Sequence, residues 1–205
     1  MDGTLIDSDE VIHQTWCELA RLYKDPSFKF TREDTRKFSG PPLADSIAKV
    51  FPEYDQDFMY KEYKSRTKKY YQSVLEFFDD EKEVLTKLKA DGKILTVDTN
   101  KIRSATVESL VQGGIDHLFD MVIGSDDVTK LKPDDEGVQI IAKHFNVKKE
   151  EILFIGDTDF DIFTAKNAGV KSCIMTLKKR DITVPELVDY WAATYNELYD
   201  LIRKI

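Results

Sequence analysis

Cysteine is scarce in this chain of 205 residues, since only Cys17 and Cys173 occur, far apart and without metal-ligand spacing. The sequence therefore suggests neither a disulfide framework nor a zinc site, and a reducing cytoplasm fits this usage best. Long apolar runs are also missing, because no stretch approaches the roughly 18 to 20 residues of a membrane-spanning helix. The N-terminus lacks the pattern of a secretory signal. We expect a soluble, cytoplasmic protein with no membrane partner.

Positive charge is in the minority. The chain has 30 Lys and Arg against 38 Asp and Glu, which gives a formal net charge of −8. An acidic surface repels nucleic-acid phosphates, so we expect no nucleic-acid partner. An anionic substrate would need a bound divalent cation or a few well-placed lysines. The length allows one domain with a large insertion or two small domains.

Strand patterns are absent from the first third of the sequence. Apolar residues recur at helical spacing after Ser8, and a longer helix is expected from Asp55 to about Gln72. Between these helices, Gly40, Pro41 and Pro42 break the chain. Residues 9–77 are therefore predicted to form a compact all-helical unit.

From Asp80 onward, predicted helices alternate with short apolar runs. The predicted helices are Glu81–Ala90, Ser104–Val111, Glu136–Phe145 and Asp161–Ala168, and the predicted strands are Ile94–Val97, Met121–Ile123, Ile152–Ile155 and Cys173–Met175. Such alternation predicts an α/β fold with a parallel sheet covered by helices on both faces. Ligands of such sheets bind at the carboxyl ends of the strands.

The segment that follows Ile152–Ile155 is rich in aspartate. Asp157, Asp159 and Asp161 stand within five residues, at the start of a helix. Acidic residues cap helix N-termini, which is the structural interpretation. Three carboxylates after a buried strand and a glycine favour a Mg²⁺ site instead, because Mg²⁺ takes oxygen ligands. We expect Asp157 and Asp161 to bind the metal and Asp159 to be a surface or capping residue.

Two other strand ends carry polar residues. Thr99 and Asn100 follow Ile94–Val97 and offer a hydroxyl and amide donors to a phosphate, although they could equally be an ordinary helix cap. Lys132 precedes a proline in the loop after Met121–Ile123. A lone lysine is usually a solvated charge, but this one is placed to neutralise a phosphate.

Together with the first residues, these segments resemble the haloacid dehalogenase superfamily, in its phosphoglycolate-phosphatase-like branch. The family's first motif is Asp, any residue, Asp-Gly-Thr, and Asp2, Gly3 and Thr4 match its end. Thr99 matches the second motif, Lys132 the third, and Asp157 with Asp161 the fourth. The resemblance implies a three-layer Rossmann-like core, residues 1–8 and 78–205, with residues 9–77 as an inserted helical cap domain.

The resemblance also implies roles for these residues. Asp2 would be the general acid and base, and its backbone carbonyl would bind Mg²⁺. Asp157 and Asp161 would complete the metal site. Thr99, Asn100 and Lys132 would hold the phosphoryl group in transfer, with Lys132 among the catalytic residues. Gly40 and Pro41 resemble the family's substrate-facing cap segment, though a rigid turn explains them equally well.

The family's nucleophile stands two residues before the acid/base aspartate and forms an aspartyl-phosphate. Counted back from Asp2, that position falls before Met1, together with the family's first strand. We therefore expect that the natural protein begins several residues earlier. The predicted activity is hydrolysis of a small phosphomonoester, phosphoglycolate first, by a monomer or homodimer. The alternatives are a non-catalytic protein that binds a phosphorylated ligand or a partner protein, and a phosphomutase of the same family.

Overall fold

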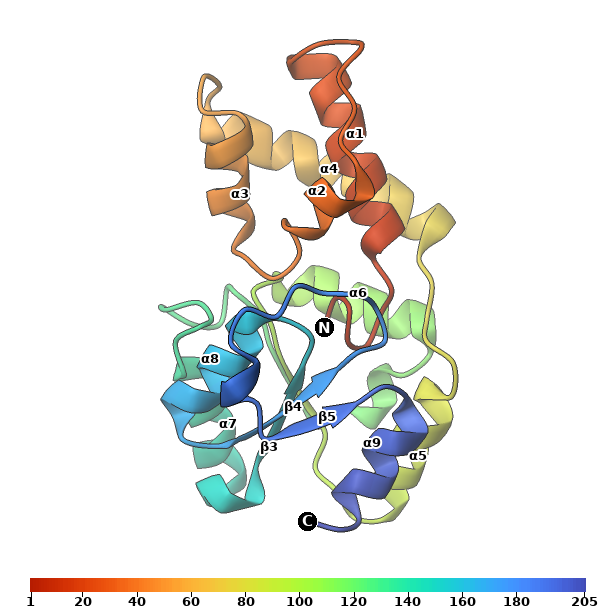
Figure 1. The fold of residues 1–205 in the computed structure, drawn as a ribbon, viewed down its shortest axis with the longest axis vertical. Coiled ribbons are helices and arrows are strands. Elements are labelled where there is room, and N and C mark those ends of the chain that lie inside the picture. Colours follow the sequence, from red (N-terminus) through yellow and green to blue (C-terminus); the bar gives the residue numbers. More distant parts are fainter. The chain divides into compact units, whose positions relative to one another are not determined.

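The computed structural model describes residues 1–205, apart from the side chain of Val74. The chain divides into two compact units (Figure 1). The α/β unit holds Met1, Gly3–Leu5 and Phe77–Ile205, and the helical unit holds Asp2 and Ile6–Glu76. That the first unit is a phosphatase core and the second its cap stays a prediction.

The helical unit contains α1 (Asp9–Tyr23), α2 (Arg32–Arg36), α3 (Leu43–Val50) and α4 (Gln56–Val74). Two of these helices begin where side chains satisfy free backbone N–H groups. Thr31 and Asp34 form a reciprocal capping box at α2, and the Asp55 carboxylate accepts from the N–H of Phe58 at α4. Such caps stabilise a helix start by about 0.5–2 kcal/mol each.

Trp16 is the centre of the helical unit's core. It is fully buried on the inner face of α1, and its ring is stacked on Phe51 with centroids 6.1 Å apart and planes 7° apart. Phe38 and Tyr63 contact the same indole, with centroids 4.4 and 5.2 Å away. Aromatic side chains bury large areas, so this cluster contributes much of the unit's stability.

The two ends of the helical unit meet at a backbone bridge. The N–H of Asp7 donates to the carbonyl of Glu76 at 2.9 Å, and the N–H of Glu76 donates to the carbonyl of Asp7 at 3.4 Å. Residues 69 positions apart are therefore adjacent in space, and the segment between them closes on itself.

The α/β unit follows the predicted alternation. Its elements are α5 (Glu81–Ala90), β1 (Thr96–Asp98), α6 (Arg103–Gly113), β2 (Met121–Ile123), α7 (Glu136–Phe145), β3 (Leu153–Gly156), α8 (Asp159–Ala168), β4 (Lys171–Met175), β5 (Tyr190–Ala192) and α9 (Tyr195–Ile202). Short 3₁₀ turns lie at Asp116–Leu118, Lys149–Glu151 and Pro185–Leu187. α8 ends at Gly169, whose φ of +70° is the left-handed conformation that glycine adopts without steric cost.

All described strand pairs are parallel, in two separate sheets. β1 pairs with β2, and β3, β4 and β5 pair in that order. The predicted parallel α/β fold is confirmed, although the strands do not form one continuous sheet. β5 was not predicted, because it is only three residues long and only Ala192 of them is buried.

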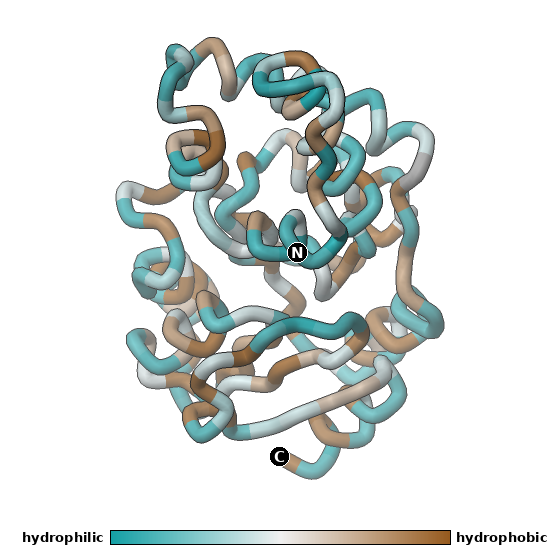
Figure 2. Tube along the Cα trace, turned by 45° about the horizontal axis from the view of Figure 1, so that its top comes forward, coloured by the Kyte–Doolittle hydropathy of each residue, from teal (hydrophilic) through white to brown (hydrophobic). Residues whose placement is uncertain are grey.

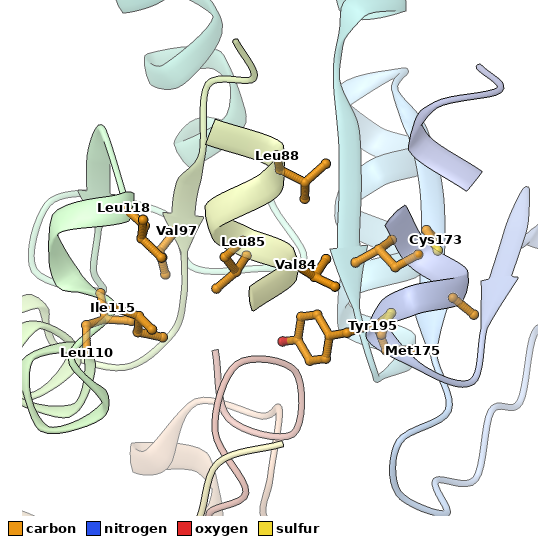
Figure 3. Packing of buried hydrophobic residues seen from close by; sticks show 12 residues of the cluster. Val84, Leu85, Leu88, Val97, Leu110, Ile115, Leu118, Cys173, Met175 and Tyr195 are labelled. Atoms are coloured by element: carbon orange, nitrogen blue, oxygen red, sulfur yellow. The ribbon is translucent and has the colours of Figure 1, made fainter. Parts of the chain in front are cut away.

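The sheet formed by β3, β4 and β5 carries apolar side chains on both faces. One cluster joins α5 and α9 to Cys173 and Met175 of β4 (Figure 3). The opposite face packs Val138 of α7 and Ala165 of α8 around Phe154 of β3. Because successive strand side chains point to opposite faces, a short strand supplies both clusters. This three-layer packing fixes the strand ends that carry the polar residues.

Hydrophilic and hydrophobic residues are interleaved along the trace (Figure 2). Across the described part of the chain, no helix is long and apolar enough to cross a membrane.

Candidate active site

Asp157 stands directly after β3 and is buried, with 3% of its surface exposed. Its Oδ1 accepts a hydrogen bond from Thr4 Oγ1 at 3.1 Å, and its Oδ2 accepts one from Arg180 Nε at 2.8 Å. Burial and the neighbouring charge of Asp161 raise the pKa of Asp157, while Arg180 opposes this shift. The carboxylate is thus held between a residue near the N-terminus and one in the loop between β4 and β5.

Gly3 lies against this carboxylate. A Cβ atom at Gly3 would come within 2.0 Å of Asp157 Oδ2 and 2.8 Å of Arg180 Nη2, and the residue's φ is +76°. Both the space and the backbone conformation therefore require glycine. Two residues of the Asp-Gly-Thr motif therefore contact Asp157. Gly3 leaves room for its carboxylate, and Thr4 donates a hydrogen bond to it.

Asp161 is engaged at both carboxylate oxygens. Oδ1 accepts from Lys132 Nζ at 2.7 Å, and Oδ2 accepts from the N–H groups of Asp157 and Thr158 and from Thr158 Oγ1. Asp161 therefore caps α8 and pairs with Lys132. Burial would raise the pKa of Asp161, but the charge and hydrogen bond of Lys132 outweigh it and hold the pKa at about 2.

Lys132 is almost fully covered, with 10% of its side chain exposed. Burial would lower its pKa, but the carboxylates of Asp161 and Asp98 outweigh burial and raise it. The lysine therefore carries its charge inside the site and is not the solvated lysine of the alternative interpretation. A buried cation of this kind is suited to an anionic group.

Asn100 holds the Lys132 segment in place. Its side-chain oxygen accepts from the N–H of Lys132 at 2.9 Å, and its amide donates to the carbonyl of Lys132 at 3.2 Å. Thr99, which is 7% exposed, follows β1, and its hydroxyl accepts from the N–H of Lys101 at 3.2 Å. The structure thus brings the second and third motifs together, while phosphate binding by Thr99 and Asn100 stays a prediction.

Two residues of the site were not predicted. Asp98, the last residue of β1, has its Oδ2 buried without a hydrogen-bond partner among the described groups, and burial raises its pKa. Its position directly after an apolar run was the available signal. Arg180 lies in the loop between β4 and β5, next to Lys178 and Lys179, and nothing in that sequence distinguishes it from a solvated charge.

The remaining predicted residues lie in the helical unit. Asp2 Oδ1 accepts a hydrogen bond from Tyr71 Oη at 2.9 Å. Gly40 has a φ of +103°, and Pro41 follows it just before α3. The catalytic and metal roles of Asp2 and the substrate roles of Gly40 and Pro41 stay predictions.

Among the side chains that the structure describes, no three His, Cys, Asp or Glu residues are grouped so as to hold a metal ion. The oxygen atoms of Asp157 are the ligand type that Mg²⁺ prefers. They are, however, paired with Arg180 and Thr4. The carboxylate of Asp157 therefore suits Mg²⁺ chemically, once Arg180 no longer binds its Oδ2.

The sequence comparison identifies the family. Residues 1–175 match the haloacid dehalogenase-like hydrolases, so the chain belongs to this family. It is 29% identical over 204 residues to Pyrophosphatase PpaX of Halalkalibacterium halodurans, covering 98% of this chain and 94% of that protein. It is 32% identical over 170 residues to Pyrophosphatase PpaX of Listeria innocua, covering 82% and 76%. The prediction of an enzyme, a phosphatase of this superfamily, is confirmed.

Solved structures agree with the fold. A predicted phosphoglycolate phosphatase from Haemophilus somnus superposes with a TM-score of 0.84 at 23% identity, covering 98% of this chain and 95% of that one. A haloacid dehalogenase-like family hydrolase from Streptococcus pneumoniae gives a TM-score of 0.83 at 24% identity, with the same coverage. At these identities the likeness concerns the fold.

Proposed function

We propose that the chain hydrolyses a small phosphorylated metabolite with Mg²⁺, in the cytoplasm, as a monomer or homodimer. The proposal rests mainly on the three polar residues that lie together near the strand ends. Asp157 follows β3, Thr99 follows β1, and Lys132 is held beside them as a buried cation. A parallel α/β sheet binds ligands at this edge.

Inorganic pyrophosphate is the first candidate substrate. The support is the similarity of nearly the whole chain to the relative named pyrophosphatase in Halalkalibacterium halodurans. Phosphoglycolate, the substrate expected from the sequence, is the second compound to test. Both carry a terminal phosphoryl group with oxygens that a buried lysine and a metal would bind.

The residues of the chain divide the work. Lys132 neutralises the phosphoryl oxygens, while Thr99 and Asn100 donate hydrogen bonds to them and Asn100 also fixes the Lys132 backbone. Asp2 protonates the leaving oxygen and later takes a proton from water. Asp161 acts through Lys132, which it orients.

Asp157 would hold Mg²⁺, together with the backbone carbonyl of Asp2 and with Asp161 through water. When bound, Mg²⁺ supplies positive charge that stabilises the phosphoryl oxygens as the bond breaks. Transfer to the protein also needs a carboxylate nucleophile, which in the family stands two residues before the acid/base aspartate that Asp2 matches.

The test is phosphate release from pyrophosphate, phosphoglycolate and para-nitrophenyl phosphate, with and without MgCl₂. Residues 1–205 are compared with the product of the same gene read upstream of Met1. Mg²⁺-dependent release from at least one compound by the longer product supports the proposal. No release by either form would overturn it in favour of a non-catalytic phospholigand-binding protein. A separate assay with a sugar phosphate tests the phosphomutase alternative, which isomerisation of that compound without phosphate release would support.

A further inference from the structure

Arg180 is a buried cation bound to a candidate metal ligand. Its side chain is 7% exposed and that of Asp157 is 4% exposed, and Nε lies 2.8 Å from Asp157 Oδ2. Gly3 leaves room for this contact, because Arg180 Nη2 lies only 2.8 Å from where a Cβ at Gly3 would stand. The guanidinium therefore fills the space at the oxygen that the proposed function gives to Mg²⁺.

Arg180 Nε takes one acceptor position of Asp157 Oδ2 at 2.8 Å. A Mg²⁺ ion bound to the same carboxylate at roughly 2.0–2.1 Å would lie close to the guanidinium. The two positive charges would also repel each other strongly in a buried site. Arg180 and a divalent cation therefore compete for Asp157.

The loop that carries Arg180 is anchored on both sides of it. The N–H of Thr176 donates to the carbonyl of Ala192 at 2.9 Å, at the end of β4. The N–H of Thr183 donates to Asp159 Oδ1 at 3.0 Å, and the Thr183 hydroxyl donates to Asp159 Oδ2 at 2.5 Å. Residues 177–182 thus lie between two anchored points. Asp159, predicted to be a surface or capping residue, holds one of these points.

We propose that Arg180 is a latch on Asp157, which a divalent cation displaces, so that residues 177–182 move when the metal binds. The inference rests on the proposed function, because it takes Asp157 as a metal ligand. While the latch is closed it supplies the positive charge that a buried carboxylate requires. When it opens, the loop releases an arginine beside the phosphoryl site.

The first test is the affinity for Mg²⁺, measured by titration calorimetry at constant ionic strength. A competing partner that keeps nine-tenths of the protein closed weakens the apparent affinity about tenfold. We therefore expect Arg180→Gln to bind Mg²⁺ about tenfold more tightly than the unchanged protein. Lys179→Gln is the matched control, since it removes one positive charge from an exposed neighbour, and its affinity should stay within about twofold.

The second test needs no variant and so remains valid if Arg180→Gln fails to fold. Hydrogen exchange of the unchanged protein is compared with and without MgCl₂. We expect exchange to become faster across residues 177–182, while the anchored amides of Thr176 and Thr183 stay protected. Slower or unchanged exchange in the loop would overturn the latch.

The outcomes separate the two proposals. If Arg180→Gln binds Mg²⁺ no more tightly than the unchanged protein, the latch is wrong, and the proposed Mg²⁺-dependent hydrolysis stands on its own assay. If neither protein binds Mg²⁺, the metal site at Asp157 and the latch are both wrong.

Discussion

Lys132 Nζ and Asp161 Oδ1 lie 2.7 Å apart, and each side chain is about nine-tenths buried. An ion pair so well covered cannot lose one partner cheaply, because the remaining charge keeps its desolvation penalty. The pair therefore links the third and fourth motifs in stability as well as in their proposed chemistry.

We expect Lys132→Met to lower the free energy of unfolding by about 3–5 kcal/mol, since it leaves Asp161 charged and unpaired. Adding Asp161→Asn should recover part of the loss. Urea denaturation of the single and double variants measures this coupling. Lys130→Met serves as the control, because that side chain is 71% exposed, and its change should stay within about 0.5 kcal/mol. Additive single and double effects would contradict the prediction.

Asp157→Asn should reduce Mg²⁺-dependent phosphate release by more than about 100-fold. A metal ligand contributes several kcal/mol of transition-state stabilisation, and each 1.36 kcal/mol is a factor of ten. Initial rates over a MgCl₂ series measure the effect. Asp200→Asn, an exposed carboxylate on α9, is the control and should keep the original rate. Full activity of Asp157→Asn would exclude this residue from the metal site.

Because the pKa of Glu81 is raised in the folded chain, we expect the folded chain to become less stable as pH rises. Burial raises the pKa of Glu81 from its ordinary 4.5 to about 7 in the folded chain. Between these values the unfolded chain loses the proton and the folded chain keeps it, so the free energy of unfolding falls with rising pH. The protonated Glu81 contributes its full stabilisation below about pH 4.5. This contribution, up to about 3 kcal/mol of the free energy of unfolding, is lost by about pH 7.

The variant that isolates this effect is Glu81→Gln, compared with the unchanged protein by urea denaturation at pH 5 and pH 8. We expect the variant to gain relative stability at pH 8. Glu83→Gln, which replaces an exposed carboxylate on the same helix, should show no such pH-dependent gain. An equal difference at both pH values would refute the assignment to Glu81.

The two tryptophans provide a matched pair for the core of the helical unit. Trp16 is fully buried among aromatic rings, whereas Trp191 on β5 is 46% exposed. We expect Trp16→Ala to lower the free energy of unfolding by about 3–5 kcal/mol and Trp191→Ala to cost clearly less. Each variant keeps one tryptophan, so fluorescence on denaturation reports both. Equal losses would contradict the packing described here.

The sequence predicted some elements to the residue and others only approximately. α5 and α7 were predicted with their observed bounds, since each is an amphipathic run that ends at a glycine or asparagine turn. α8 begins at Asp159, two residues before its predicted start. Asp157 and Asp161 were interpreted as metal ligands, which stays a prediction, and Asp161 also caps this helix. Capping and metal binding use the same residue type, so composition alone does not separate them.

The polar site was predicted in part for a similar reason. Thr99, Lys132 and Asp157 follow strands, and parallel topology brings strand ends together. Arg180 contacts Asp157 across 23 positions, through a loop with no periodic pattern. Only the folded loop shows that the side chain of Arg180 is covered while Lys179 is exposed.

The bridge between Asp7 and Glu76 has a consequence for how this chain accommodates a large insertion. Joining the ends of a flexible segment costs entropy that grows with its length. Here the inserted segment closes its own ends by backbone hydrogen bonds, so the α/β unit need not constrain a long loop. In loop-closure entropy, residues 7–76 therefore cost the α/β unit about as little as a tight turn would. Segments of other lengths and sequences could be exchanged at this junction if their own termini are held equally close.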